Sequence, residues 1–188
     1  MGQGVRELFS LGPAYAHRGG DGEIRGLEPF AAYFRHAEPS WRVFANGSHH
    51  LCAILPDTTV RCWGHNHWSQ SADFTVHGDV LGSPTAPGLD CVRDLALAPD
   101  HTCALRTDGT VWCWGADRNG QSGVAPGSAS RCTSAFPQPC VMQPTRVDGI
   151  DGVRRLYAGY AATCAVRADE SVWCWGSGYS TSPMLTGW

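Results

Sequence analysis

Apolar and polar positions alternate over short stretches of the chain, and this alternation predicts β-strands rather than helices. The clearest stretch is HTCALRTDGTVWCWG at 101–115, in which two apolar segments flank a polar Thr-Asp-Gly turn at 107–109. A period of two residues is typical of a strand with one buried face. A three-residue connection that ends in glycine is common in hairpins. The stretch therefore predicts a hairpin in which Cys103 lies opposite Cys113.

Nearly the same phrase occurs twice more, as HLCAILPDTTVRCWG at 50–64 and ATCAVRADESVWCWG at 162–176. The two cysteines of a phrase are always 10 positions apart, whereas the first cysteines of successive phrases are 51 (103 − 52) and then 61 (164 − 103) positions apart. A constant internal spacing with a variable outer spacing is typical of a repeat protein with tolerant loops. We predict repeats at about 41–90, 91–150 and 151–188, each with an alternating segment before its hairpin.

Cysteines that face each other across a hairpin are placed to form a disulfide. Directly opposed strand residues have Cβ atoms about 4.5–5.5 Å apart, close to the roughly 3.5–4.5 Å that a disulfide requires. Free thiols packed as small apolar side chains are the alternative. The predicted pairs are Cys52–Cys62, Cys103–Cys113 and Cys164–Cys174 in the repeats and Cys132–Cys140 in the insertion after the second hairpin, which leaves Cys91 unpaired.

The second repeat carries the most complete motif, with His101, the two cysteines, an Asp-Gly-Thr-Val turn, a Trp-Gly pair and an Asn-Gly-Gln-x-Gly segment at 119–123. This motif resembles the repeat of the regulator-of-chromosome-condensation family, in the cysteine-bearing version of bacterial secreted and surface proteins. The resemblance covers roughly residues 41–188 and implies a β-propeller built from small antiparallel sheets. The third repeat departs from the motif, since it has Ala162 in place of the histidine and lacks the Gly-Gln segment.

The fold class that we predict is all-β, an incomplete β-propeller of three antiparallel blades, or four if residues 1–40 contribute strands. Residues 1–40 do not match the repeat, and we expect an irregular segment with a short helix at 27–37, where apolar residues share one helical face. The resemblance implies a ring of about seven blades, and the smallest rings have roughly four. We therefore expect the chain to be a fragment of a longer protein.

Composition narrows the classes of partner and compartment. The 188 residues include 14 basic and 17 acidic side chains, a balance that argues against a nucleic-acid partner. No apolar run approaches the roughly 18 residues of a membrane span. Paired cysteines are typical of an oxidising compartment, so we predict an extracytoplasmic or secreted protein. The N-terminus lacks the features of a signal peptide, and a truncated start would reconcile the two observations.

Signals for catalysis or metal binding are sparse. The first repeat contains four histidines and two cysteines, but it lacks the close Cys-x2-Cys pair that zinc sites commonly use. No nucleophile motif such as G-x-S-x-G occurs. The aspartates at the hairpin turns are expected to bond their own backbone. We therefore predict no catalytic residue, no metal and no cofactor, with a zinc-dependent enzyme kept as an alternative.

The function that we predict is a non-enzymatic module that binds a protein or a glycan through the variable loops, chiefly 115–140. The candidate contact residues are Trp68, Arg118 and Phe136, because an exposed tryptophan outside the repeated core can anchor a partner. The tryptophans that recur in register are expected to pack between blades. The resemblance also implies an alternative, a guanine-nucleotide-exchange regulator of a small GTPase. Open blade edges would in addition favour self-association.

Overall fold

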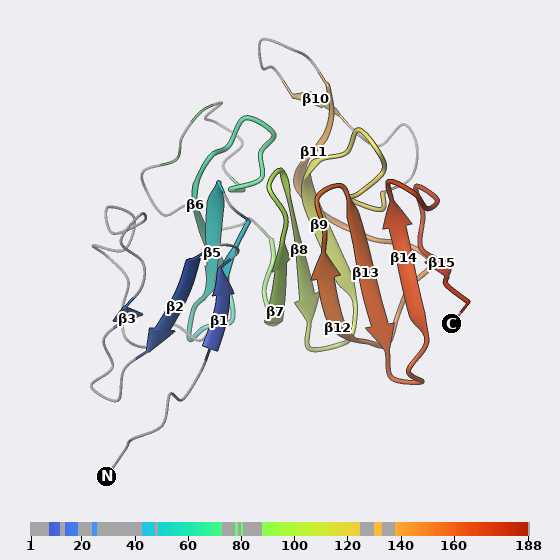
Figure 1. Ribbon diagram of the computed structural model, residues 1–188, viewed down its shortest axis with the longest axis horizontal. Helices are drawn as coiled ribbons and strands as arrows, with labels where there is room; N and C mark the ends of the chain where they lie inside the picture. Colours follow the sequence, from blue (N-terminus) through green and yellow to red (C-terminus); the bar gives the residue numbers. More distant parts are fainter. Residues whose placement is uncertain are drawn as a thin grey trace.

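The computed structural model describes residues 8–11, 14–18, 24–25, 43–47, 49–72, 78, 80, 88–124, 130–132 and 138–187, with the backbone alone in the strands before residue 47 and at 130–131. No helix occurs among these residues, and their strands form antiparallel sheets. The sheets follow one another in chain order across the molecule (Figure 1). The predicted all-β, propeller-type architecture is therefore confirmed.

Four sheets are present in the described residues. The first contains β1 (Leu8–Leu11), β2 (Ala14–Arg18) and β3 (Ile24–Arg25), and the second contains β4 (Val43–Asn46), β5 (His50–Ile54) and β6 (Val60–Gly64). The third has the order β10-β11-β9-β8-β7, from β7 (Val92–Leu97), β8 (His101–Arg106), β9 (Val111–Ala116), β10 (Ser130–Cys132) and β11 (Gln138–Arg146). The fourth contains β12 (Val153–Ala158), β13 (Ala162–Arg167), β14 (Val172–Gly176) and β15 (Met184–Leu185).

The first sheet differs from the irregular N-terminal segment that we expected. Strand β1 pairs with β2 from Leu8 opposite His17 to Leu11 opposite Ala14, and β2 then pairs with β3. This is the alternative in which residues 1–40 contribute strands to a fourth sheet. The strands could not be recognised as a repeat because they carry no cysteine-tryptophan phrase. The helix expected at 27–37 lies outside the described residues.

The hairpins have the register that the sequence predicts. Cys52 lies opposite Cys62, and the third and fourth sheets repeat this arrangement at Cys103 and Cys164. The structure contains four disulfides, Cys52–Cys62, Cys103–Cys113, Cys132–Cys140 and Cys164–Cys174, and Cys91 is free and exposed. The three hairpin disulfides join Cα atoms that are 4.0 or 4.1 Å apart, so each one fixes the pairing of two neighbouring strands.

All three hairpins have the same turn. An aspartate carboxylate accepts the amide N–H of the residue two positions later, as Asp108 does from Thr110 at 3.0 Å. The position after the aspartate has a left-handed backbone, with φ of +82° at Gly109, +68° at Thr58 and +64° at Glu170. Thr58 and Glu170 take the place of glycine at this position, where a side chain is expected to cause strain or a different turn type. The turn is kept, and the strain falls on the two non-glycine residues.

The core is divided between the interfaces of neighbouring sheets. One cluster lies between the second and third sheets and contains Ile54, Val60, Leu95 and Trp114. The other lies between the third and fourth sheets and contains Leu105, Val111, Leu156 and Trp175. The tryptophans that recur next to the second cysteine, Trp63, Trp114 and Trp175, are at most 1% exposed, as the repeat pattern predicted. Each sheet thus buries apolar surface against the next, as propeller blades do.

A hydrogen-bond network accompanies the apolar contact between the second and third sheets. The Nε2 atom of His50 lies 2.6 Å from the hydroxyl of Thr102 across the interface. The same hydroxyl donates to the backbone carbonyl of Gln70 at 3.0 Å, and the indole N–H of Trp114 donates to that carbonyl at 3.0 Å. Two side chains of the third sheet therefore hold one loop carbonyl of the second.

The third and fourth sheets repeat the network with equivalent residues. His101 Nε2 lies 2.9 Å from the Thr163 hydroxyl, which donates to the carbonyl of Gln121 at 3.0 Å. The indole N–H of Trp175 donates to the same carbonyl at 2.9 Å. The repeated phrase thus specifies the joint between sheets as well as the hairpin within each sheet.

The network determines the tautomer of both histidines, and burial determines their charge state. The Thr102 hydroxyl has one hydrogen and gives it to Gln70, so it accepts from His50, which must carry its proton on Nε2. Burial, together with the neighbouring His101, lowers the pKa of His50 from 6.5 to about 3. Burial likewise lowers the pKa of His101 to about 4. Both rings are therefore neutral at physiological pH.

Candidate functional site

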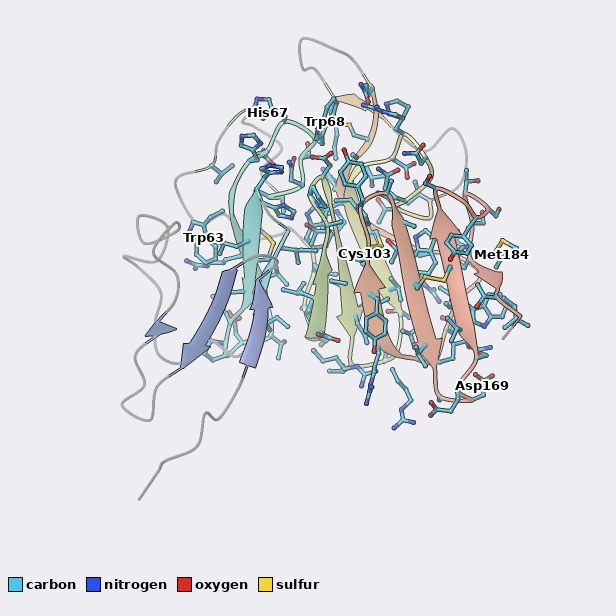
Figure 2. All side chains as sticks on the ribbon, viewed as in Figure 1. Trp63, His67, Trp68, Cys103, Asp169 and Met184 are labelled. Atoms are coloured by element: carbon cyan, nitrogen blue, oxygen red, sulfur yellow. A yellow bond between two sulfur atoms is a disulfide. The ribbon has the colours of Figure 1, made fainter. Side chains whose placement is uncertain are left out.

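The two ends of the sheets carry different kinds of connection. The hairpin turns lie at one end, where Figure 2 labels Asp169, and the loops that follow β6 and β9 lie at the other, where it labels His67 and Trp68. The turns are short and nearly identical, whereas the loops are longer and vary in sequence. Variable loops on a rigid scaffold are the usual location of binding residues. We refer to residues 65–72 and 117–124 as the loop rim.

The backbone of the loop rim is held by side chains within each loop. The Gln70 side-chain carbonyl accepts the amide N–H of Trp68 at 2.9 Å. The equivalent Gln121 accepts the amide N–H of Asn119 at 2.8 Å. Because these glutamines also offer their backbone carbonyls to the network between sheets, the rim is tied directly to the core. The glutamine of the repeat motif thus holds the backbone of both loops.

A second contact repeats at the start of each loop. The Asn66 side chain accepts the amide N–H of Ser71 at 3.0 Å, and the Asp117 carboxylate accepts the amide N–H of Ser122 at 2.9 Å. Burial raises the pKa of Asp117 to about 6, well above the ordinary value of 3.8. The carboxylate thus occupies a site that an uncharged amide fills in the preceding sheet.

The rim presents different side chains on these equivalent frames. His65 and His67 are exposed on the first loop and Trp68 beside them is half-buried, whereas the second loop exposes Arg118 and Asn119. His49 joins the first group, with ring centroids 5.4 Å from His65, and the rings of His65 and His67 are 4.9 Å apart. The surface therefore combines stacked imidazoles, an indole and a guanidinium, groups that are well suited to protein contacts.

The structure describes two of the three predicted contact residues. Trp68 and Arg118 belong to equivalent loops of neighbouring sheets, whereas Phe136 lies outside the described residues. Sequence reasoning considered His49, His65 and His67 only as zinc ligands, and it missed that His65 and His67 lie on the rim with His49 stacked against His65. The alignment of His50 with His101 would have separated the structural histidine from its exposed neighbours, because only that position recurs.

The described residues contain no group of three or more His, Cys, Asp or Glu side chains arranged to hold a metal ion. The turn aspartates bond within their own turns, as at Asp169, whose carboxylate accepts the amide N–H of Ser171 at 3.1 Å. In the same part of the chain, no helix is long and apolar enough to cross a membrane.

Comparison with known proteins identifies the repeat. Residues 92–121 match the model of the regulator of chromosome condensation (RCC1) repeat. The chain is 29% identical over 148 residues to the protein pim1 of Schizosaccharomyces pombe, an alignment that covers 70% of this chain and 26% of pim1. The resemblance inferred from the sequence is therefore confirmed at the level of the repeat.

Solved structures give the same result for the fold. Yeast RCC1 (Prp20) in complex with Kap60 superposes with a TM-score of 0.80 at 17% identity, covering 97% of this chain and 48% of Prp20. Prp20p of Saccharomyces cerevisiae in a second structure gives the same score and identity, with 50% of that chain covered. Human WBSCR16 superposes with a TM-score of 0.63 at 19% identity, over 77% of this chain and 37% of that protein.

These relatives are longer than this chain. The chain spans about a quarter of pim1 and about half of each Prp20 chain. At 17–19% identity the solved structures establish the fold alone, so the chain has the fold of part of an RCC1-type propeller.

Proposed function

We propose that this set of RCC1 repeats is a non-enzymatic module that binds a protein partner through the loop rim. One observation carries the proposal. The two loops share a hydrogen-bonded frame, while the side chains that this frame presents differ completely, His67 and Trp68 against Arg118 and Asn119. A fixed frame with variable exposed residues separates stability from recognition, which is the arrangement of a binding scaffold.

The chemistry of the rim favours a protein over a glycan. Tryptophan and arginine dominate the binding energy of protein interfaces, and histidine adds hydrogen bonds to polar groups. Among the relatives, Prp20p is described with its binding properties to Gsp1p and histones, and yeast RCC1 is described bound to Kap60. Protein partners are therefore the precedent for this fold.

The disulfides support an extracytoplasmic or secreted location. Four pairs in 188 residues are unusual for a reducing compartment, where thiols are kept reduced. The proposed module would accordingly meet its partner outside the cytoplasm. No disulfide cysteine belongs to the loop rim, and the polar contact between the two in the described residues joins the Cys132 sulfur to the hydroxyl of Ser69 at 3.8 Å, away from the exposed residues of 65–68 and 117–119.

A regulator that promotes nucleotide exchange on a small GTPase is the second candidate. The likeness to Prp20p, with its binding to Gsp1p, favours it. The chain covers half of Prp20p, so it offers only part of the surface that a full ring provides. Accelerated release of a labelled guanine nucleotide from a small GTPase would favour this candidate over the extracytoplasmic module.

The test of the leading proposal is affinity capture with the oxidised full chain from the secreted or extracytoplasmic fraction of the source organism. The rim variant replaces Trp68 and Arg118 by alanine, and the matched control replaces Arg146, an exposed arginine that pairs with Asp151 at 2.8 Å. We expect a captured partner to lose about tenfold or more in affinity for the rim variant, because anchor residues contribute most of the binding energy.

The control defines what would contradict the proposal. The Arg146→Ala variant should bind like the parent chain, since it removes an arginine of similar exposure away from the rim. A partner that binds the rim variant as tightly as the parent would place recognition elsewhere. No specific partner under oxidising conditions, combined with nucleotide exchange on a GTPase, would replace the proposal by the second candidate.

A further inference from the structure

A third loop, residues 177–183 after β14, lies at the same end of the sheets as the loop rim. In each sheet one hydrogen bond closes the base of the loop, from the amide N–H of the residue after the Trp-Gly pair to the carbonyl of the residue before the second strand. The three bonds are 2.8 or 2.9 Å long and join His65 to His49, Ala116 to Asp100 and Ser177 to Ala161. Two positions further along the chain, His67, Arg118 and Tyr179 are therefore equivalent residues.

The side chain at this position is exposed in all three sheets. Tyr179 is 44% exposed, and His67 and Arg118 are exposed as well. The sheets that carry His67 and Arg118 each pack against the sheet that follows them, so the exposure of this position does not depend on an open face. The loops therefore present one variable side chain per sheet at the end opposite the turns.

The second loop of the rim and the third loop are packed together. A Cβ added at Gly120 would lie 2.6 Å from the Cα of Thr181, so the two backbones approach so closely that only a glycine fits. The neighbouring carbonyl of Gln121 accepts hydrogen bonds from two side chains of the fourth sheet. Arg118 and Tyr179 therefore stand on adjoining loops whose relative position is fixed, and one partner is able to touch both.

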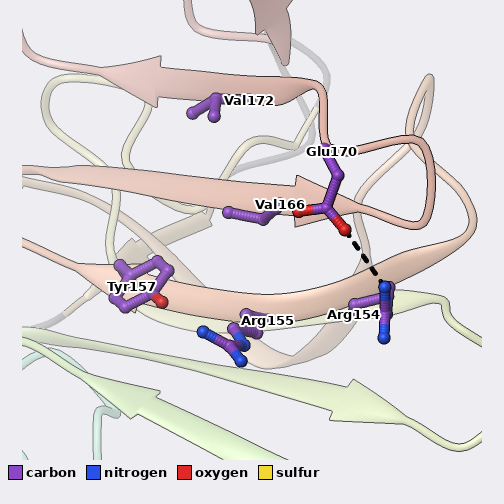
Figure 3. Close-up of a pocket in the computed structure, with 6 residues that line it drawn as sticks. All are labelled: Arg154, Arg155, Tyr157, Val166, Glu170 and Val172. Atoms are coloured by element: carbon purple, nitrogen blue, oxygen red, sulfur yellow. Dashed lines mark hydrogen bonds and ion pairs between the residues drawn. The ribbon is translucent and has the colours of Figure 1, made fainter.

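Arg118 also differs in its ionic contacts from the arginines near the turns. Arg154, for example, pairs with Glu170 of its own sheet at 3.1 Å (Figure 3). Arg118 is exposed and forms no ion pair with any residue that the structure describes. None of the three loops exposes a carboxylate in the described residues, since Asp117 is half-buried and accepts a hydrogen bond within its own loop. The guanidinium of Arg118 is thus available to a carboxylate of a partner.

Short polar side chains flank the tyrosine on the third loop. Ser177, Ser180 and Ser182 are all exposed beside Tyr179. The binding loops of antibodies combine the same groups, because serine supplies adaptable hydrogen bonds and tyrosine supplies rigid contact area. Tyrosine, like the tryptophan and arginine of the first two loops, is among the residues that contribute most to the binding energy of protein interfaces.

We propose that the third loop extends the loop rim into one interaction surface, and that this surface fits a folded protein with a carboxylate opposite Arg118 and an apolar patch opposite Tyr179. The inference rests on the proposed function, which assigns recognition to the first two loops alone. Anchors on three separate sheets require a partner of similar breadth. Interfaces of about 800 Å² per partner are typical of folded proteins, and such an area needs several loops.

The experiment is site-specific photo-cross-linking of the oxidised full chain in the extracytoplasmic fraction of the source organism. The photoreactive residue p-benzoylphenylalanine replaces Tyr179, Asn119 or Tyr157 in separate variants. Asn119 is exposed beside Arg118, and Tyr157 is the matched control, a 54% exposed tyrosine in the lining of a cavity of about 400 Å³ on the same sheet (Figure 3). We expect the Tyr179 and Asn119 variants to cross-link to the same protein, and the Tyr157 variant to give no such product.

Affinities for the cross-linked protein then test the chemistry of the contact. We expect Tyr179→Ala and Arg118→Gln each to weaken binding about tenfold or more, and Arg118→Lys, which keeps the charge, to weaken it less. The substituted side chains are exposed, so circular dichroism should show an unchanged fold. Equal loss for Arg118→Gln and Arg118→Lys would overturn the assignment of a carboxylate to the partner.

The outcomes separate this inference from the proposed function. Cross-linking from Asn119 without cross-linking from Tyr179 would overturn the inference and leave recognition by the first two loops intact. Absence of a product from both positions would overturn the proposed function and the inference with it. Cross-linking from Tyr157 as strong as that from Tyr179 would also overturn the inference, because contact would then extend beyond the loops.

Discussion

At the scale of single residues, the turn position after the aspartate shows how one side chain affects stability. Gly109 has φ of +82°, and a Cβ added there would lie 3.1 Å from the Cα of Gly152. Glu170 has φ of +64° at the equivalent position. We expect Gly109→Ala to lower the free energy of unfolding by about 1 kcal/mol and Glu170→Gly to raise it by about 0.5 kcal/mol, because glycine adopts this conformation without steric cost.

Urea unfolding of the oxidised chain, followed by tryptophan fluorescence, measures both changes. The opposite signs provide the control, since a nonspecific effect of substitution in an exposed turn would not reverse between two equivalent positions. Destabilisation by Glu170→Gly would show that its exposed ion pair with Arg154 outweighs the backbone strain.

At the scale of elements, the hairpins were predictable from the sequence because their determinants are local. Ten positions separate the cysteines of each hairpin, and a three-residue turn then fixes which residues face each other. The sheet of β1–β3 could not be found in this way, because its strands share no phrase with the repeats. The bonds between sheets also escaped prediction, since His50 and Thr102 are 52 positions apart.

The loop that begins at Asp117 gives a prediction about pH. Its folded pKa of about 6 exceeds the ordinary 3.8, so the folded state binds the proton more tightly and loses stability as the pH rises through this interval. The first loop has the uncharged Asn66 in the same position. We expect Asp117→Asn to stabilise the chain by about 1 kcal/mol at pH 7.5, because the amide removes a desolvated charge and keeps the acceptor for Ser122.

The gain should disappear at pH 4, where the carboxyl of the parent is protonated, and urea unfolding at the two pH values measures the difference. Stabilisation of equal size at both pH values would contradict the electrostatic explanation.

Thr163→Val tests the hydrogen bonds between the third and fourth sheets instead. It leaves the Nε2–H of His101 without an acceptor, so we expect a loss of about 1–3 kcal/mol.

Thr181→Val is the matched control for the joint, because Thr181 is exposed and the same atoms are exchanged. Both variants should retain their disulfides, and chemical unfolding compares their free energies. A loss at Thr163 no larger than that at Thr181 would show that packing alone holds the third and fourth sheets together.

At the scale of the whole molecule, the repeated joints make stability depend on pH in a way that no single hairpin does. His50 and His101 have folded pKa values of about 3 and 4, below the 6.5 of an unfolded histidine. As the pH falls below 6.5, these two histidines therefore become protonated in the unfolded chain while they remain neutral in the folded chain. Each histidine should reduce the free energy of unfolding by about 1.4 kcal/mol per pH unit between pH 6 and pH 4.

Urea unfolding at intervals between pH 7.5 and pH 4 measures this slope for the oxidised chain. His101→Gln provides the comparison, because glutamine can donate to Thr163 but does not take up a proton, and it should remove about half of the slope contributed by the two histidines. The protonation of Asp117 acts in the opposite direction, so the Asp117→Asn background isolates the histidine contribution. A slope that His101→Gln leaves unchanged would mean that protonation of this ring does not limit stability, and that the sheets separate at acid pH for another reason.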